Sequence, residues 1–203
     1  MIMSNGVDKK AKKGEYLDIL LRSKKTVFST KDIALLWRDA GTGAARVRLN
    51  YYAKTGKLIR ARRGLYVKDK NYDKYELATN ILRPSYVSFE TVLGAAGITF
   101  QYYEQIFVAS YAKRDIICDG QLYSFRKISK VILINPAGVD QSGEYSIATK
   151  ERAFLDTIYR SKDYHFDNLS PLDWDKVFEI LLIYGNKKMA KKVREYYDYY
   201  KAA

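Results

Sequence analysis

Residue types that support enzymatic chemistry are sparse in this chain of 203 residues. His165 is its one histidine and Cys118 its one cysteine, which excludes multi-histidine metal sites and histidine-based triads elsewhere in the chain. Asp115 and Asp119 could bind a metal ion in a nuclease, but Asp119 begins an Asp-Gly hairpin signal and Asp115 is expected at a strand end. No glycine pattern of a nucleotide-binding loop is present. We therefore expect no catalytic residue, no metal and no cofactor, and a metal-dependent nuclease is the least favoured hypothesis.

Positive charge is concentrated in the first third of the chain. Residues 1–70 contain 18 Lys and Arg against 6 Asp and Glu, a balance of +12, whereas residues 71–203 contain 18 against 17, a balance of +1. This segregation indicates a polyanionic partner, and nucleic acid is the first candidate. Arg60, Arg62 and Arg63 repel one another unless a phosphate backbone neutralises them. The competing interpretation is a solvated edge ribbon whose charges deter aggregation.

The helices expected in this basic region have clear local signals. Residues 15–23 have the apolar spacing of a helix. Ser29, followed by an acid three residues later, predicts the N-cap of a second helix. Thr42 predicts the N-cap of a third helix over residues 43–55, which Gly56 ends in a left-handed conformation.

Short strands are expected on both sides of this helix pair. Residues 26–28, 57–59 and 65–67 are rich in β-branched and other apolar residues. The last two of these segments are expected to form a hairpin, with a tip made of Arg60, Arg62, Arg63 and Gly64. Strand, two helices and a basic hairpin in this order are the layout of a winged helix-turn-helix, which predicts a DNA-binding domain over residues 1–70.

The third helix is expected to have a buried face and a groove-reading face. At about 100° per residue, the inward face carries Ala45, Leu49, Tyr52 and Ala53. The opposite face carries Ala44, Val47, Asn50, Tyr51 and Lys54, with Arg46 and Arg48 on its flanks. Small residues let the backbone approach DNA, polar and apolar side chains can meet base edges, and arginines can meet phosphates. The predicted DNA-binding residues are therefore Thr42, Ala44, Arg46, Val47, Arg48, Asn50, Tyr51, Lys54, Arg60, Arg62 and Arg63.

The remainder of the chain is expected to be a second, near-neutral domain. Residues 71–84 are predicted to form a linker helix that Pro84 ends, and residues 85–203 to form a mixed α/β domain. Strand-like segments with turn residues between them predict a small, mainly antiparallel sheet; they are residues 106–111, 116–118, 121–128, 131–135 and 145–148. The fold class is thus α+β, with a winged helix-turn-helix ahead of a sheet and C-terminal helices.

Two helices are expected at the C-terminus. Ser170 and Pro171 predict the start of the first, and Gly185 ends it. The second, over residues 186–201, carries a basic surface made of Lys187, Lys188, Lys191, Lys192 and Arg194. This surface is either the solvated face of a packed helix or a docking surface for an acidic partner or a second stretch of nucleic acid.

Three segments resemble the AbiEi family of antitoxins. Residues 56–67, Gly-Lys-Leu-Ile-Arg-Ala-Arg-Arg-Gly-Leu-Tyr-Val, are similar to the family's G-x-L-x-R-x-x-x-G-x-Y wing pattern. Residues 85–98 resemble its Y-V-S-x-x-S-A-L-x-x-x-G-L segment, in which Ser88 is expected to cap a short helix. Residues 149–159 resemble A-x-P-E-R-A-L-L-D, with Lys150 in place of the proline and Thr149 as the expected N-cap.

The resemblance implies an antitoxin that also represses its own transcription. Its winged helix would bind inverted repeats in promoter DNA, and its second domain, residues 85–203, would counteract a nucleotidyltransferase toxin. In the family this arrangement is a type IV toxin–antitoxin system of abortive infection and phage resistance, in which the two proteins need not form a stable complex. The alternative is a winged-helix regulator whose C-terminal domain senses a ligand or dimerises, with no toxin.

A cytoplasmic location is expected from three further observations. No apolar run approaches the length of a membrane span, the first residues lack the apolar core of a signal peptide, and the single cysteine cannot form an internal disulfide.

Overall fold

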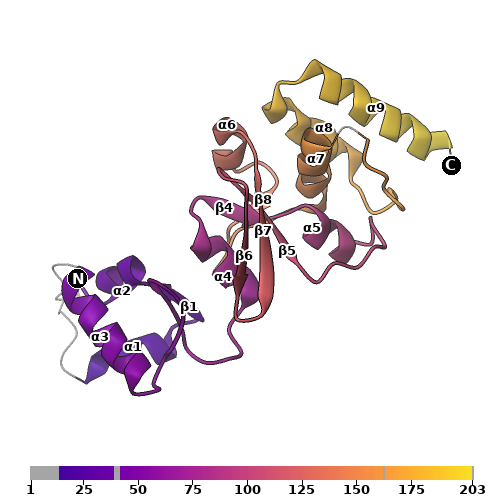
Figure 1. Cartoon of the computed structure of the whole chain (residues 1–203). Helices are drawn as coiled ribbons and strands as arrows, with labels where there is room; N and C mark the ends of the chain where they lie inside the picture. The colour runs from indigo at the N-terminus through magenta and orange to yellow at the C-terminus, as the bar shows by residue number, and fades with distance from the viewer. Residues whose placement is uncertain (1–13, 39–41, 162, 203) are drawn as a thin grey trace, which may run out of the picture. The chain divides into compact units, whose positions relative to one another are not determined.

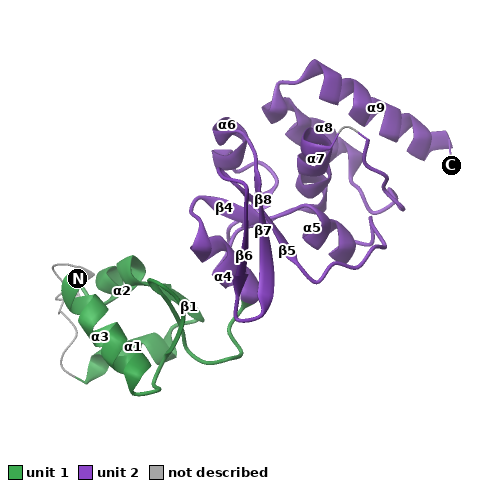
Figure 2. Ribbon diagram, viewed as in Figure 1, with its two compact units in different colours: residues 1–73 green, residues 74–203 purple. Residues whose placement is uncertain are grey.

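The chain folds into two compact units, Met1–Asp73 and Lys74–Ala203 (Figure 2). The computed structural model describes residues 14–38, 42–161 and 163–202. The first 13 residues of the expected DNA-binding domain lie outside this described part, as do residues 39–41 between its second and third helices.

Three helices and a three-stranded antiparallel sheet make up the described part of the first unit (Figure 1). The helices are α1 (Glu15–Arg22), α2 (Thr30–Leu36) and α3 (Thr42–Lys54), and the strands are β1 (Val27–Ser29), β2 (Ile59–Arg62) and β3 (Leu65–Val67). Strand β3 is central, in the order β1-β3-β2. Ser29 caps α2 as expected, because its Oγ accepts from the Asp32 N–H at 3.1 Å. Gly56, with φ of +70°, follows α3 in the left-handed conformation expected of it.

The core of the first unit lies between the helices and the sheet. It contains the buried residues Tyr16, Leu20, Phe28, Ile33, Ala34, Trp37, Ala45, Leu49, Leu58 and Tyr66. Trp37 packs edge-on against Tyr16 with ring centroids 5.1 Å apart, and its Nε1 donates to the Tyr16 carbonyl oxygen at 2.9 Å. Ala45 and Leu49 are fully buried, so the prediction for the inward face of α3 is confirmed.

The basic hairpin differs from the sequence prediction. Strand β2 runs from Ile59 to Arg62 rather than over residues 57–59, so Arg60 and Arg62 lie on the strand and only Arg63 and Gly64 form the turn. Two residues suffice because Gly64 adopts a φ of +81°, which a residue with a Cβ rarely does. The register changes between Ile59 and Arg62, where β2 has one more residue than β3, so β2 contains a bulge.

The second unit is built on a six-stranded sheet in the order β6-β7-β5-β4-β9-β8. The strands are β4 (Ser85–Val87), β5 (Ile106–Ser110), β6 (Arg114–Cys118), β7 (Gln121–Lys127), β8 (Val139–Asp140) and β9 (Ile147–Ala148). The helices are α4 (Lys74–Ile81), α5 (Glu90–Ala95), α6 (Lys130–Ile134), α7 (Lys150–Arg160), α8 (Trp174–Leu181), the short 3₁₀ turn η1 (Leu182–Tyr184) and α9 (Lys187–Ala202). The sheet is mixed, because β4 pairs in parallel with β9 and β5 with β7, which was not expected from the sequence.

Two segments of the second unit differ from expectation in their role or type. The expected linker helix is α4, and it belongs to the second unit, with Leu77 and Ala78 fully buried. Residues 131–135, expected as a strand, form most of α6. The apolar pair that α6 buries, Ile132 and Leu133, is consecutive in sequence, whereas a strand would have sent the two side chains to opposite faces.

Helix starts in this unit were predicted with mixed success. Thr149 caps α7 as expected, by accepting from the Arg152 N–H. Ser88 does not cap α5, because Phe89 holds the N-cap position and the Ser88 hydroxyl donates elsewhere. Helix α8 begins at Trp174 with Asp173 as its cap, later than the expected start at residue 170.

Candidate nucleic-acid interface

The outward face of α3 is exposed along its described length. Val47 is 70% exposed and Tyr51 is 57% exposed, and Ala44, Asn50 and Lys54 are exposed with them. Val47 and Tyr51 are four residues apart and therefore adjacent on the helix surface. The exposed face of α3 therefore offers an adjacent apolar pair and polar side chains together to a partner. Thr42 begins α3, but its side chain lies outside the described part of the chain.

The two arginines that flank this face have different environments. The Arg48 guanidinium carbon lies 4.0 Å from the centroid of the Tyr16 ring and 6.0 Å from that of Trp37. A guanidinium over aromatic rings in a half-buried position stabilises the fold of its own unit. Arg46 is exposed, which leaves it the better placed of the two to contact a phosphate.

Asn50 is held by a residue that the sequence analysis did not single out. The hydroxyl of Tyr66, on β3, donates to the Asn50 Oδ1 at 2.9 Å. Tyr66 is only 2% exposed, so its ring belongs to the core while its hydroxyl reaches the exposed face of α3. No local pattern could have found this pair, because the two residues come from a helix and a strand that meet only in the tertiary structure.

The three hairpin arginines are exposed, two on β2 and one in the turn. The turn itself is anchored to α2. The Thr30 backbone N–H donates to the Gly64 carbonyl oxygen at 3.1 Å, and the Thr30 Oγ1 donates to the same oxygen at 3.4 Å. The hairpin is therefore attached at its turn to the N-terminus of the helix that precedes α3.

The predicted basic surface of the second unit lies on α9. Lys187, Lys188, Lys191 and Arg194 are exposed, while Met189 and Val193 bury the other side of the helix. Lys192 is half-buried and lies 3.8 Å from Asp163 and 3.5 Å from Glu195, so its charge is partly neutralised within the unit. Four of the five predicted cations thus point to solvent.

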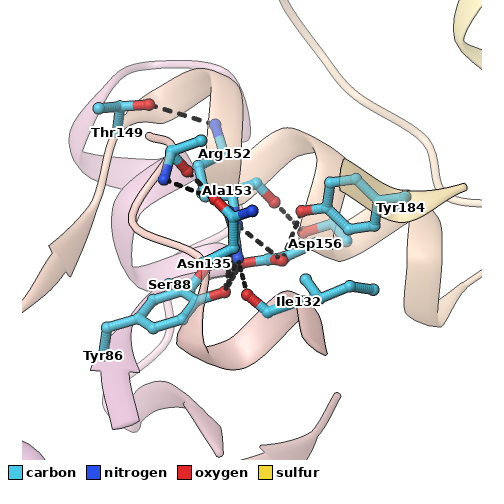
Figure 3. Close-up of polar contacts among 11 residues, drawn as sticks. Tyr86, Ser88, Ile132, Asn135, Thr149, Arg152, Ala153, Asp156 and Tyr184 are labelled. Carbon is cyan, nitrogen blue, oxygen red and sulfur yellow. Dashed lines mark hydrogen bonds and ion pairs between the residues drawn. The ribbon is translucent and has the colours of Figure 1, made fainter. Parts of the chain in front are cut away.

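A fully buried polar network lies at the centre of the second unit (Figure 3). Asp156 accepts from the hydroxyls of Tyr184 at 2.6 Å, Ser88 at 2.8 Å and Tyr86 at 2.9 Å, and from the Arg152 Nε at 3.4 Å. The remaining Arg152 nitrogens donate to the carbonyl oxygens of α6 and its following turn, at 2.7 and 2.6 Å. Arg152 and Asp156 are 0% exposed, so this network lies inside the unit, where it holds α7, β4 and α6 together.

The pKa shifts in this network follow from burial. Burial raises the pKa of the Tyr86 and Tyr184 hydroxyls well above their ordinary range, so both remain neutral donors. Burial also raises the pKa of the Asp156 carboxyl, although the Arg152 guanidinium and the three hydroxyl donors favour its ionised form. Satisfied buried networks of this kind specify one packing arrangement.

The carboxylates considered as nuclease ligands take part in other interactions or turns within the second unit. Asp115 accepts from the Ser124 hydroxyl at 2.7 Å, and Asp119 lies in the β6–β7 turn with φ of +50°. Glu90 pairs with Arg126 at 2.7 Å. Across residues 14–38, 42–161 and 163–202, no three His, Cys, Asp or Glu side chains come together as metal ligands would.

His165 and Cys118 do not belong to a group of metal-ligand side chains among the described residues either. His165 is almost fully exposed beside Asp167, and Cys118 is buried.

In the part of the chain that the structure describes, no helix has the length and apolar character needed to cross a bilayer.

Comparison with known protein families finds a match to the first unit. Residues 15–67 match the family model described as "Transcriptional regulator, AbiEi antitoxin". The matched span runs from the start of α1 to the end of β3, and so includes every described helix and strand of that unit. No curated protein matches the chain. The first unit is therefore similar to the N-terminal region of AbiEi antitoxin regulators over residues 15–67.

Proposed function

We propose that this protein is a DNA-binding antitoxin that represses its own promoter. Its first unit acts as a winged helix-turn-helix, with α2 and α3 as the helix pair and the β2–β3 hairpin as the wing. The observation that carries the proposal is the exposed face of α3, polar and apolar side chains together, on a unit with a balance of +12 charges over residues 1–70. The AbiEi family match over the same unit supports it.

In the proposed complex, α3 enters the major groove of promoter DNA. Val47, Asn50 and Tyr51 meet base edges, and Arg46 with the arginines of the hairpin meets the phosphate backbone. Two copies on inverted repeats would each place one α3 in the groove, at a half-site spacing near one helical turn.

The second unit is proposed to carry the antitoxin activity. It would counteract a nucleotidyltransferase toxin in a type IV system, in which antitoxin and toxin act without a stable complex, and so take part in abortive infection and phage resistance. The antitoxin role of this unit is what the AbiEi resemblance implies, and the charge balance of only +1 beyond residue 70 supports DNA binding in the first unit alone. The exposed cations of α9 are the surface proposed for a partner, and they fit an acidic protein or nucleic acid.

A second candidate function is a transcriptional regulator whose C-terminal unit senses a ligand and involves no toxin. An open cavity of about 570 Å³ favours it. The cavity is open to solvent and is lined by Tyr102, Tyr103 and Gln121 with their neighbours, whose aromatic rings and polar groups a ligand could contact.

The two candidates are separated by a growth assay. The protein is co-expressed with a nucleotidyltransferase toxin of a type IV system, in its parent form and as the Arg60→Ala, Arg62→Ala, Arg63→Ala variant. We expect both forms to restore growth, because the antitoxin activity lies in the second unit. Failure of both forms favours the ligand-sensing regulator, and rescue by the parent alone contradicts the division of labour between the units.

A further inference from the structure

We infer that Tyr66 is a positioning residue that presents the Asn50 amide to DNA, so that Asn50 reads adenine in the operator. This inference rests on the proposed DNA-binding function and adds the base class read at one position. It concerns a hydrogen bond between the hairpin and α3, whereas the proposed function itself needs only their exposed surfaces.

The geometry restricts the Asn50 side chain. Tyr66 lies on the central strand β3 and is 2% exposed, so its ring cannot move without disturbing the core. Its hydroxyl donates to the Asn50 Oδ1 at 2.9 Å. Asn50 is itself exposed between Val47, Tyr51 and Lys54, on the face of α3 that points to solvent. A freely rotating surface amide is thereby held in one orientation.

The direction of this hydrogen bond decides which group of Asn50 is presented. The phenolic hydroxyl donates, so the amide oxygen faces Tyr66 and the amide nitrogen remains to donate outward. A carbonyl oxygen has two lone pairs and can accept a second hydrogen bond. The held amide can therefore donate to N7 of adenine and accept from its N6 amino group, the bidentate pairing that asparagine makes in the major groove.

A simpler role for the pair would be structural only. A buried tyrosine hydroxyl needs a hydrogen-bond partner, and Asn50 supplies one. The two roles make different predictions, because a structural partner would affect the stability of the fold without changing the base that is selected.

The experiment selects binding sites from a library of randomised DNA duplexes with the full-length protein. The parent, Tyr66→Phe, Asn50→Ala and Asn50→Asp forms are compared. Phenylalanine keeps the core volume and removes only the hydroxyl, and aspartate keeps an acceptor for Tyr66 while removing the donor to N7. Asn50 is exposed, so its variants test the reading of adenine independently of how well Tyr66→Phe folds.

We expect the parent to select adenine at one position of each half-site. Replacing that base by 7-deazaadenine, which lacks the N7 acceptor, should weaken the parent by about 5- to 150-fold. Asn50→Asp and Asn50→Ala should lose both the preference and the sensitivity to 7-deazaadenine. Tyr66→Phe should lose much of the preference while its binding to unrelated duplexes and its salt dependence stay those of the parent.

Other results overturn the inference in distinguishable ways. If the parent selects a site and Tyr66→Phe selects the same base with the same affinity, Tyr66 does not position Asn50. If all Asn50 variants retain the parent's preference, Asn50 does not read a base. If the parent binds no duplex at any salt concentration, the proposed function fails and the inference fails with it.

Discussion

Removing the three hairpin arginines should change how DNA binding depends on salt. Arg60, Arg62 and Arg63 are exposed, and the Gly64 turn beside them is attached to α2 through Thr30. The arginines are thus presented on an anchored hairpin and not on a free loop. Each arginine that neutralises one phosphate releases condensed counterions, which makes log K fall with log salt by about 0.9 per contact.

The size of the effect follows from the number of contacts. Three lost phosphate contacts should reduce the slope by about 2.7. Between about 50 and 200 mM salt, the parent should therefore lose about 40-fold more affinity than the Arg60→Ala, Arg62→Ala, Arg63→Ala variant. The variant should be weakened on related and unrelated sequences alike, because phosphate contacts carry no sequence information.

A matched control separates location from net charge. The Lys113→Ala, Lys127→Ala, Lys130→Ala variant removes an equal number of positive charges from exposed positions of the second unit that lie outside the basic face of α9. Fluorescence anisotropy over a salt series should give this control the slope of the parent. An unchanged slope in the arginine variant would refute the assignment of the hairpin as a phosphate-binding wing. Equal loss in both variants would mean that net charge, and not the hairpin, determines binding.

Three further predictions concern stability and charge. Arg48→Ala should lower the free energy of unfolding by about 1 kcal/mol, because the guanidinium loses its contacts with aromatic rings. Arg46→Ala should leave stability unchanged and reduce the slope of log K against log salt for DNA binding by about 0.9. Equal slopes for the two variants would contradict the difference in their environments. Gly138 has φ of +70°, and a Cβ there would lie 2.7 and 2.9 Å from side-chain carbons of α8 and α7. Gly138→Ala should therefore lower the free energy of unfolding, measured with denaturant, by about 2–4 kcal/mol. The control Gly143→Ala has open space around its Cβ and should stay within about 0.5 kcal/mol of the parent. Hydrogen bonds from the side chain and backbone N–H of Lys176 lower the pKa of Asp173. The ionised carboxylate therefore contributes stability above the unfolded pKa of about 3.9, and this stability is lost as the pH falls through the lower folded pKa. The stability difference between the parent and Asp173→Asn should be present at neutral pH and vanish in strong acid, and a difference that persists in strong acid would refute the ionic contribution.

The local sequence determined those features whose causes lie within a few residues. Ser29 caps α2 and Thr149 caps α7, because each hydroxyl reaches a backbone N–H three residues later. The buried and exposed faces of α3 follow from helical periodicity alone, with Leu49 inside and Val47 outside. The family match to the first unit agrees with the resemblance found in its hairpin motif.

Long-range contacts decided the rest. Ser88 was expected to cap a helix, but its hydroxyl donates to Asp156, 68 residues away in the chain. The apolar run in α6 could equally well have formed a strand, and its packing in the second unit fixed it as a helix. Nothing near Asn50 in the sequence indicates Tyr66, because their hydrogen bond joins residues of α3 and β3 that only folding brings together.

The sequence by itself thus determined that the first unit is a basic helix pair with a hairpin, and which face of α3 is exposed, since charge and periodicity are properties of the chain. Only the tertiary structure decided which side chains of α3 have partners within the unit and which remain available for DNA. Arg48 is held over Tyr16 and Asn50 is held by Tyr66, because folding brings an aromatic ring or a hydroxyl within reach of each.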